Sequence, residues 1–382
     1  MKGNVLMIYL DNAATTMPSQ RVCDEIKSGL ECFGNPSSLH RLGVEAEKKL
    51  ENSRETIAKA LGVQPQEIYF TSGATESNNT AIFGSAKKFG KRKKRVVTTS
   101  IEHPSVAEAF NRLETECFEV VRVAPDEQGR ITASDIVSAV DENTFLVSCM
   151  LVNNENGYIL PVAKAFSAIK KRFPDVLTHC DCVQAFMKIP LKAKTLGADM
   201  ISLSAHKIHG PKGVGALYLK KGVTIPSLLI GGGQERTFRS GTESVPLICG
   251  FAGAVEELSG DVSERFEYVK SLQAYLFEKC REHDFIHINS DDDCSPYVNS
   301  IALSGLKSEV LLHFLEERDI FVSSGSACSK GKKSSVLKEF KVDNKYLDST
   351  IRISFSKNNT KTDVDTLIEN LLEADKKLCK IK

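Results

Sequence analysis

The sequence predicts an α/β fold in which a large domain with a mainly parallel, helix-covered sheet is followed by a smaller α+β domain. Between residues 68 and 221, short apolar runs alternate with segments of helical periodicity. This β–α–β–α order is typical of a parallel sheet with its functional site at the carboxyl ends of the strands. The composition changes near residues 259–263, which we interpret as the domain boundary. A chain of 382 residues is long enough for two such domains.

Apolar periodicity and turn residues predict the elements of the large domain in order. An extended arm over residues 1–16 precedes a helix over 19–32, in which Ser19 is the expected N-cap and Val22, Ile26 and Leu30 share one face. A second helix, over residues 39–61, ends at Gly62. The other expected strands are 68–70, 96–100, 118–123, 145–151, 177–180, 200–203 and 214–219, and the other expected helices are 71–83, 134–140 and 161–173.

The second half of the chain predicts fewer strands and longer helices. We expect a long helix over residues 263–280, a strand over 298–303 and a helix over 306–317. Thr360 and Asp363 resemble the two ends of a capping box at the start of the last helix. This helix is predicted to have an apolar face.

Composition and charge exclude several classes of protein. The formal net charge of +1 gives no reason to expect direct nucleic-acid binding, and the basic run at residues 87–95 is interpreted as a solvated helix end and loop. No apolar run approaches the roughly 20 residues that a membrane-spanning helix needs, and we expect a cytoplasmic protein without an export signal. The eleven cysteines contain no C-x-x-C pair, so neither a disulfide framework nor a metal site is expected.

Lys207 lies on a loop at the mouth of the strand 200–203, between two apolar runs. A solvated surface lysine is the simplest interpretation. Ser204 and His206 favour a phosphate site instead, and a lysine whose pKa is lowered by its surroundings is the usual former of Schiff bases. A nucleotide phosphate loop at GPKGVG is disfavoured, because the spacing is wrong and the loop opens a strand rather than a helix.

Polar residues that could take part in binding or catalysis follow three other predicted strands. The turn at residues 71–77 leads into a helix and presents backbone N–H groups that suit a phosphate, although a capped helix without a ligand explains it equally well. His103 is either a satisfied core histidine or a group that moves protons near neutral pH. Asp181 is either the N-cap of a helix or a carboxylate for a cofactor ring.

Several motifs, taken in order, resemble those of the cysteine desulfurases, which are pyridoxal-phosphate (PLP) enzymes of the aminotransferase fold class. Besides the stretch around Lys207, the motifs are YLDNAATT at residues 9–16, GNPSSLH at 34–40, FTSGATESNN at 70–79, EHPSV at 102–106, NNENG at 153–157, DCVQA at 181–185, GGGQERTFRSGTE at 231–243 and SSGSAC at 323–328. They span nearly the whole chain, so the resemblance is specific.

The resemblance implies a PLP-dependent transferase of fold type I (aspartate aminotransferase-like) with a seven-stranded sheet. The implied large domain comprises residues 16–260, and residues 1–15 and 261–382 form the small one. Lys207 would hold PLP and deprotonate the substrate, His103 would assist proton transfer, and Asp181 would keep the ring nitrogen protonated. The other implied contacts are Ala74, Thr75, Ser204 and His206 to the phosphate, Gln184 to the ring hydroxyl, Asn154 to cofactor and substrate, Arg352 to the substrate carboxylate, and Thr242 to the partner chain's cofactor phosphate in a homodimer.

Cys328 lies in a small, polar and basic stretch, residues 323–335, which predicts a mobile loop. Three lysines within five positions should lower the pKa of its thiol. An incidental exposed thiol and metal ligation are the alternatives, and the resemblance implies a nucleophile. The stretch after Cys328 is shorter than in many relatives, and Ser335 replaces a common histidine. These departures concern the sulfur acceptor more than the chemistry.

The predicted function is therefore conversion of L-cysteine to L-alanine, with the sulfur held as a persulfide on Cys328. The sulfur acceptor is expected to be an iron–sulfur scaffold protein or a tRNA thiolation enzyme. A selenocysteine lyase and a catalytically silent PLP-fold scaffold for sulfur transfer remain as alternatives. An aminotransferase is disfavoured, because transamination has no use for a mobile cysteine.

Overall fold

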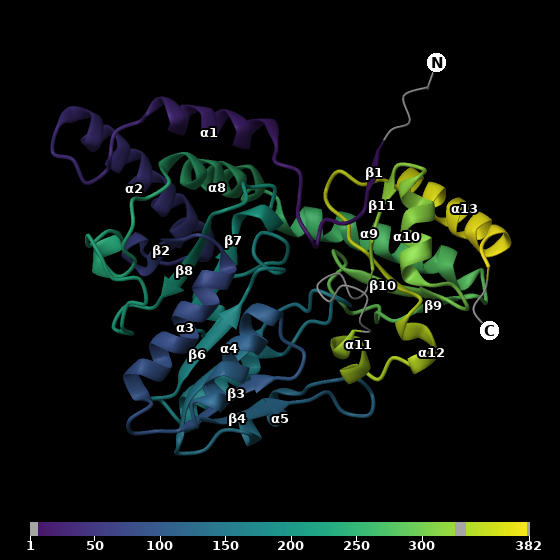
Figure 1. The fold of residues 1–382 in the computed structure, drawn as a ribbon, viewed down its shortest axis with the longest axis horizontal. Coiled ribbons are helices and arrows are strands. Elements are labelled where there is room, and N and C mark those ends of the chain that lie inside the picture. The colour runs from purple at the N-terminus through teal and green to yellow at the C-terminus, as the bar shows by residue number, and fades with distance from the viewer. Residues whose placement is uncertain (1–6, 325–333, 380–382) are drawn as a thin grey trace.

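The computed structural model describes residues 7–324 and 334–379 and places them in two parts that lie side by side (Figure 1). The larger part contains a seven-stranded sheet and the smaller part a four-stranded sheet. Cys328 lies outside the described residues.

The large sheet has the strand order β2-β8-β7-β6-β5-β3-β4. Its strands are β2 (Ile68–Thr71), β3 (Arg95–Thr99), β4 (Glu119–Val123), β5 (Thr144–Met150), β6 (Leu177–Asp181), β7 (Met200–Ser204) and β8 (Gly215–Leu219). Only β8 runs antiparallel to its neighbours β2 and β7 within this sheet. It can do so because a short loop joins it to β7, whereas parallel neighbours need long crossovers. The expectation of a mainly parallel seven-stranded sheet is confirmed.

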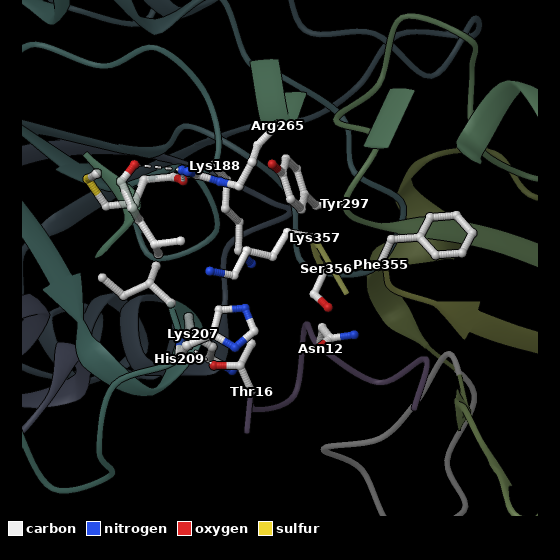
Figure 2. Close-up of a pocket in the computed structure, with 13 residues that line it drawn as sticks. Asn12, Thr16, Lys188, Lys207, His209, Arg265, Tyr297, Phe355, Ser356 and Lys357 are labelled. Carbon is white, nitrogen blue, oxygen red and sulfur yellow. Dashed lines mark hydrogen bonds between the residues drawn. The ribbon is translucent and has the colours of Figure 1, made fainter. Parts of the chain in front are cut away.

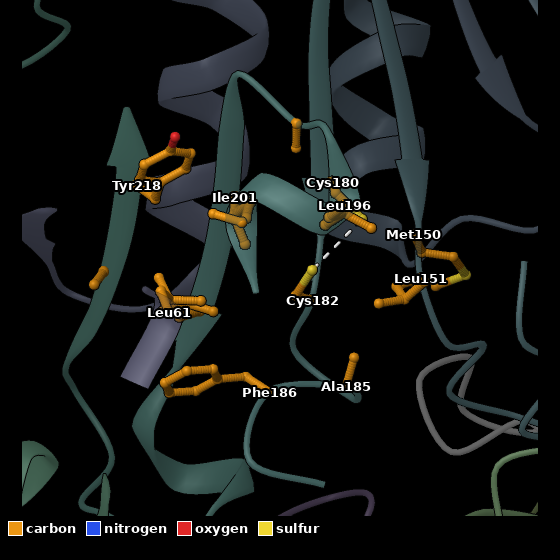
Figure 3. Packing of buried hydrophobic residues seen from close by; sticks show 14 of the residues in the cluster. Leu61, Met150, Leu151, Cys180, Cys182, Ala185, Phe186, Leu196, Ile201 and Tyr218 are labelled. Carbon is orange, nitrogen blue, oxygen red and sulfur yellow. Dashed lines mark hydrogen bonds between the residues drawn. The ribbon is translucent and has the colours of Figure 1, made fainter. Parts of the chain in front are cut away.

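Helices and buried apolar side chains cover both faces of this sheet. On one face, α3 (Ala74–Phe89) and α4 (Pro104–Thr115) contribute Ile82 and Phe110 to one cluster of buried side chains. On the other, α2 (Arg41–Leu61), α6 (Val162–Arg172) and α8 (Val245–Leu258) contribute to the largest cluster, part of which Figure 3 shows around Phe186. The remaining helices of this part are α1 (Gln20–Glu31), α5 (Ala133–Ser138) and α7 (Ala193–Leu196).

The small part has its own antiparallel sheet and its own buried core. The sheet order is β12 (Ser323–Ser324), β13 (Thr350–Ile353), β10 (Asn299–Leu303) and β9 (Ile286–Ile288), and the helices are α9 (Val262–Arg281), α10 (Ser308–Glu316), α11 (Ser335–Glu339), α12 (Asn344–Leu347) and α13 (Lys361–Lys377). The N-terminal β1 (Ile8–Tyr9) pairs in parallel with β11 (Ile320–Phe321). Leu10 and Ala13 consequently belong to the core of the small part.

Most helix ends lie where the local sequence signals predicted them. Ser19 caps α1, Gly62 ends α2 in the left-handed conformation, and Thr360 and Asp363 form the expected capping box. Leu30, which was predicted to share a face with Val22 and Ile26, has a side chain that is 63% exposed, whereas Val22 is buried. At Gly29, α1 approaches α8 so closely that a Cβ would lie 2.5 Å from Cα of Pro246, and the next residue consequently points outward.

Candidate active site

A cavity of about 550 Å³ lies at the carboxyl ends of the parallel strands. Most of the residues expected to bind cofactor or substrate line it: Ala74, Thr75, His103, Asn154, Asp181, Gln184, Ser204, His206, Lys207 and Arg352. Thr242 does not line it and is exposed. The chain therefore brings together side chains from four strand ends, one helix N-terminus and the small sheet.

Lys207 ends a short 3-10 turn, Ala205–Lys207, that directly follows β7. Its Nζ donates hydrogen bonds to the carbonyl oxygens of Ala13 at 2.8 Å and Ala14 at 2.7 Å. The turn closes tightly at Gly210, where a Cβ would lie 2.9 Å from the Ala205 carbonyl oxygen. The amine is thus held at the cavity wall against the N-terminal arm.

Asp181, the last residue of β6, is buried and fully engaged by hydrogen bonds. Its Oδ1 accepts from the backbone N–H of Val183 at 2.9 Å, and its Oδ2 accepts from Nδ2 of Asn78 at 2.8 Å. The other hydrogen of the Asn78 amide is directed at Oγ of Ser105, also at 2.8 Å.

His103 is the N-cap of α4, and its ring is largely buried. Its Nδ1 accepts from the backbone N–H of Ser105 at 3.1 Å and lies 2.8 Å from Oγ of Ser105. Burial lowers the pKa of His103, Asp181 opposes this shift, and Lys207 adds to it. Since Nδ1 acts as an acceptor, the neutral ring carries its proton on Nε2.

The N-terminus of α3 opens onto the cavity. Its N-cap, Gly73, has a φ of 152° and no side chain to satisfy the first N–H groups, and a Cβ there would meet nothing within 4 Å. His206 faces the same cavity, and burial, followed by Lys207 and Lys212, lowers its pKa to about 4. Unsatisfied N–H groups at the start of a helix favour an anion such as phosphate.

Arg352 reaches the cavity from β13 of the small sheet. Its guanidinium donates to Oδ1 of Asp11 at 2.9 Å and to the carbonyl oxygen of Asn154 at 3.0 Å. Its buried Nε has no hydrogen-bond partner among the described residues. The guanidinium of an arginine at a cavity is suited to bind a carboxylate through paired hydrogen bonds.

This donor set fits PLP. It combines a primary amine for the aldehyde, a buried carboxylate for the ring nitrogen and a helix N-terminus for the phosphate, all on one cavity. The sequence motifs contained Asn78, Ser105 and Asp11, but sequence reasoning gave them no role. Only their hydrogen bonds distinguish them from neighbouring polar residues.

The segment that carries Cys328 is flanked by described residues near this cavity. Ser323 pairs with Arg352 in the register of β12 and β13. On the other side, Ser334 caps α11, and its hydroxyl donates to Oε2 of Glu155. Burial raises the pKa of Glu155 to about 7.

Two further searches covered the described residues. Within residues 7–324 and 334–379, no helix is long and apolar enough to cross a bilayer. The same ranges contain no group of three or more His, Cys, Asp or Glu side chains arranged to hold a metal ion.

Comparisons with known proteins give full-length matches. The family model described as aminotransferase class-V matches residues 8–367. A NifS/IcsS protein homolog of Lactobacillus delbrueckii subsp. bulgaricus is 42% identical over 95% of each chain. The putative cysteine desulfurase IscS 1 of Bacillus subtilis is 37% identical over 97% of this chain and 99% of its own. Among solved structures, a NifS-like protein superposes with a TM-score of 0.92 at 39% identity, covering 98% of this chain and 100% of the other. A structure described as SspA in complex with cysteine has a TM-score of 0.80 at 33% identity, covering 92% and 100%.

Proposed function

This chain belongs to the aminotransferase class-V family as a PLP-dependent cysteine desulfurase, and from that premise we propose how its residues divide the work. The observation that carries the proposal is the single cavity that unites Lys207, Asp181 and His103 with Arg352. When bound, PLP supplies an electron sink for the pair released at the substrate α-carbon.

The binding roles follow from charge and position. The first turn of α3, at Ala74 and Thr75, binds the cofactor phosphate together with Ser204 and His206. Asp181, which accepts hydrogen bonds from Asn78 and Val183, would face the ring nitrogen, and Gln184 would contact the ring hydroxyl. Arg352 and Asn154 bind the substrate carboxylate, for which the guanidinium of Arg352 places a fork of donors at the cavity.

The proton and sulfur steps use three side chains. Lys207 holds the cofactor covalently and then takes the proton from the substrate α-carbon. His103 moves a proton at Nε2, because Nδ1 is occupied by Ser105. The thiolate of Cys328 attacks the substrate sulfur. A new S–S bond forms while the bond between the sulfur and the β-carbon breaks, and its electron pair stays with the β-carbon. Protonation of the β-carbon and return of a proton to the α-carbon give alanine.

The assembly and the destination of the sulfur complete the proposal. The protein acts as a homodimer in the cytoplasm, and the exposed Thr242 binds the cofactor phosphate of the partner chain. The sulfur acceptor is a protein of iron–sulfur assembly or of tRNA thiolation.

The decisive test replaces Cys328 by Ser and follows both products of the reaction. We expect Cys328→Ser to keep the yellow cofactor, because Cys328 belongs to neither the lysine nor the phosphate site. It should release little alanine from cysteine and show no persulfide by mass spectrometry after alkylation.

Cys23→Ser is the matched control, since Cys23 is exposed on α1, away from the cavity. It should form persulfide and alanine as wild type does. Full activity of Cys328→Ser, with persulfide on another cysteine, would overturn the mechanism. A wild-type protein that takes up no PLP would overturn the function as a whole.

A further inference from the structure

Lys188 is a buried lysine that none of the steps above uses. It is 6% exposed and follows Gln184 by four residues in the segment after β6. Burial lowers the pKa of its amine to about 7, with smaller contributions from Lys207 and Arg352. A lysine buried this deeply destabilises the fold unless it is compensated.

The surroundings of Lys188 are cationic. Figure 2 shows it on the wall of a small cavity of about 20 Å³ together with Lys207, Arg265 and Lys357. Arg265 is paired with Asp261, and Lys357 is paired with Glu257 at 2.5 Å. Lys188 differs from both, because no carboxylate of the described residues lies within ion-pair distance of its Nζ. Among residues 7–324 and 334–379, its amine therefore has no carboxylate counter-ion.

The polar contact of Lys188 leads to the active site. Its Nζ donates to Oε1 of Gln184 at 2.8 Å, and Nε2 of Gln184 donates to the carbonyl oxygen of Ala13 at 2.9 Å. That same carbonyl oxygen accepts from Nζ of Lys207. Because the Ala13 carbonyl oxygen can only accept, the NH₂ group of Gln184 must face it on the side of Lys207, and the Gln184 carbonyl oxygen consequently faces the amine of Lys188.

Resting on the proposed function, we propose that Lys188 is a positioning residue that orients the Gln184 amide for the cofactor and, when protonated, places a second positive charge behind Lys207. The charge acts in a buried environment, where screening by water is weak. The other titratable or charged groups facing this region are His206, Lys207, His209, Arg265, Tyr297, Arg352 and Lys357. The positive charge of Lys188 also contributes to lowering the pKa values of His206 and His209.

The test compares PLP-loaded wild type with Lys188→Met, which keeps the length of the side chain and removes both charge and donor. Below about pH 7, where Lys188 is protonated, the pH titration of the visible PLP band should be displaced to higher pH by about one unit, because a cation no longer opposes protonation beside Lys207. The dissociation constant for PLP should rise about 3- to 10-fold, as expected for one misoriented hydrogen bond. Lys188→Arg, which retains the charge, should titrate with the same midpoint of the PLP band as wild type.

The matched control is Lys192→Met, four residues further along and exposed, which should change neither quantity. Gln184→Leu is a second variant, which removes the amide and leaves Lys188 in place. Since Lys188 acts on affinity through Gln184, the double variant should bind PLP no more weakly than Gln184→Leu alone. Additive losses in the double variant would overturn the positioning role, even if Lys188→Met folds poorly.

Thermal stability separates this proposal from a purely structural role. The folded pKa of about 7 lies below the ordinary 10.5, so the cost of burying the ammonium is complete below pH 7 and fades between pH 7 and 10.5. The deficit in Tm of wild type relative to Lys188→Met should therefore shrink over that range. An unchanged band midpoint with only a Tm effect would overturn the inference, whereas failure of wild type to bind PLP would overturn the proposed function.

Discussion

At the scale of single residues, Asn78 connects the groups that hold the cofactor ring and move protons. The side-chain NH₂ group of Asn78 donates one hydrogen bond to Asp181 and one to Ser105. Ser105 in turn contacts His103. The carboxylate fixes which end of the amide faces it, because an ionised Asp only accepts. Asp181 and His103 thus belong to one continuous hydrogen-bond network.

Asp181→Ala removes the negative end of this network and leaves Lys207 and the phosphate site intact. The protein should still bind PLP, but alanine formation should fall roughly 100- to 1,000-fold, the range for removing one electrostatic group from a reacting centre. The measurement is alanine release by PLP-saturated protein. Asp175→Ala, an exposed aspartate before β6, is the control and should keep its activity. Near wild-type turnover of Asp181→Ala would show that another group supports the ring nitrogen.

At the scale of elements, a buried ion pair holds the loop that carries Thr242. Residues Glu235, Arg236 and Thr237 all have positive φ values, at 48°, 56° and 67°. Such conformations cost energy in residues other than glycine, so other contacts must maintain them. Both Glu235 oxygens accept from Arg54 of α2 at 2.8 Å, and Oε2 also accepts from the backbone N–H of Phe70.

Arg54→Met should lower the free energy of unfolding by about 3–5 kcal/mol, because it leaves the buried Glu235 carboxylate without its partner. Arg41→Met on the same helix removes an arginine whose side chain is 86% exposed and should change stability by less than about 1 kcal/mol. Both values come from urea unfolding. Adding Glu235→Gln to Arg54→Met should recover part of the loss, and a loss equal to that of Arg41→Met would refute a stabilising role for the pair.

At the scale of the whole molecule, the N-terminal arm joins the two sheets at the active site. It pairs with β11, donates from Asn12 to the Ser354 carbonyl oxygen, and offers the carbonyl oxygens of Ala13 and Ala14 to Lys207. We therefore propose the division into residues 16–260 and residues 1–15 with 261–382, in which the small domain supplies Arg352 and the arm.

The exposed apolar side chains of the large part bear on the proposed homodimer. They include Phe33 and Leu39 between α1 and α2, and Ile230 in the loop after β8. We expect Leu39→Asp with Ile230→Asp to dissociate the dimer in sedimentation velocity, because two charges would enter an apolar interface. Affinity for PLP should fall with dissociation, since Thr242 would no longer complete the partner's site.

Val310→Asp changes a half-exposed apolar residue of α10 in the small part and serves as the control. It should leave the sedimentation coefficient unchanged. A monomeric wild type would refute the homodimer and the role of Thr242, without affecting the assignment of Lys207.

The sequence by itself determined the fold class, the family and the activity, which the comparisons confirm. It also predicted most residues of the cavity, because parallel strands place their carboxyl ends at one edge and the polar motifs directly follow those ends. The roles of these residues, including Cys328 and Thr242, stay predictions.

Only the tertiary structure decided which polar groups meet. The link from Asn78 to Asp181 spans 103 positions, and that from Arg352 to Asp11 spans 341, so no local pattern signals either. The close contact between Gly29 of α1 and Pro246 of α8 decided which part of α1 is covered, and it leaves Leu30 exposed. Burial likewise gives Lys188 its lowered pKa, because desolvation depends on every element packed around the amine and leaves no trace in the spacing of lysines along the chain.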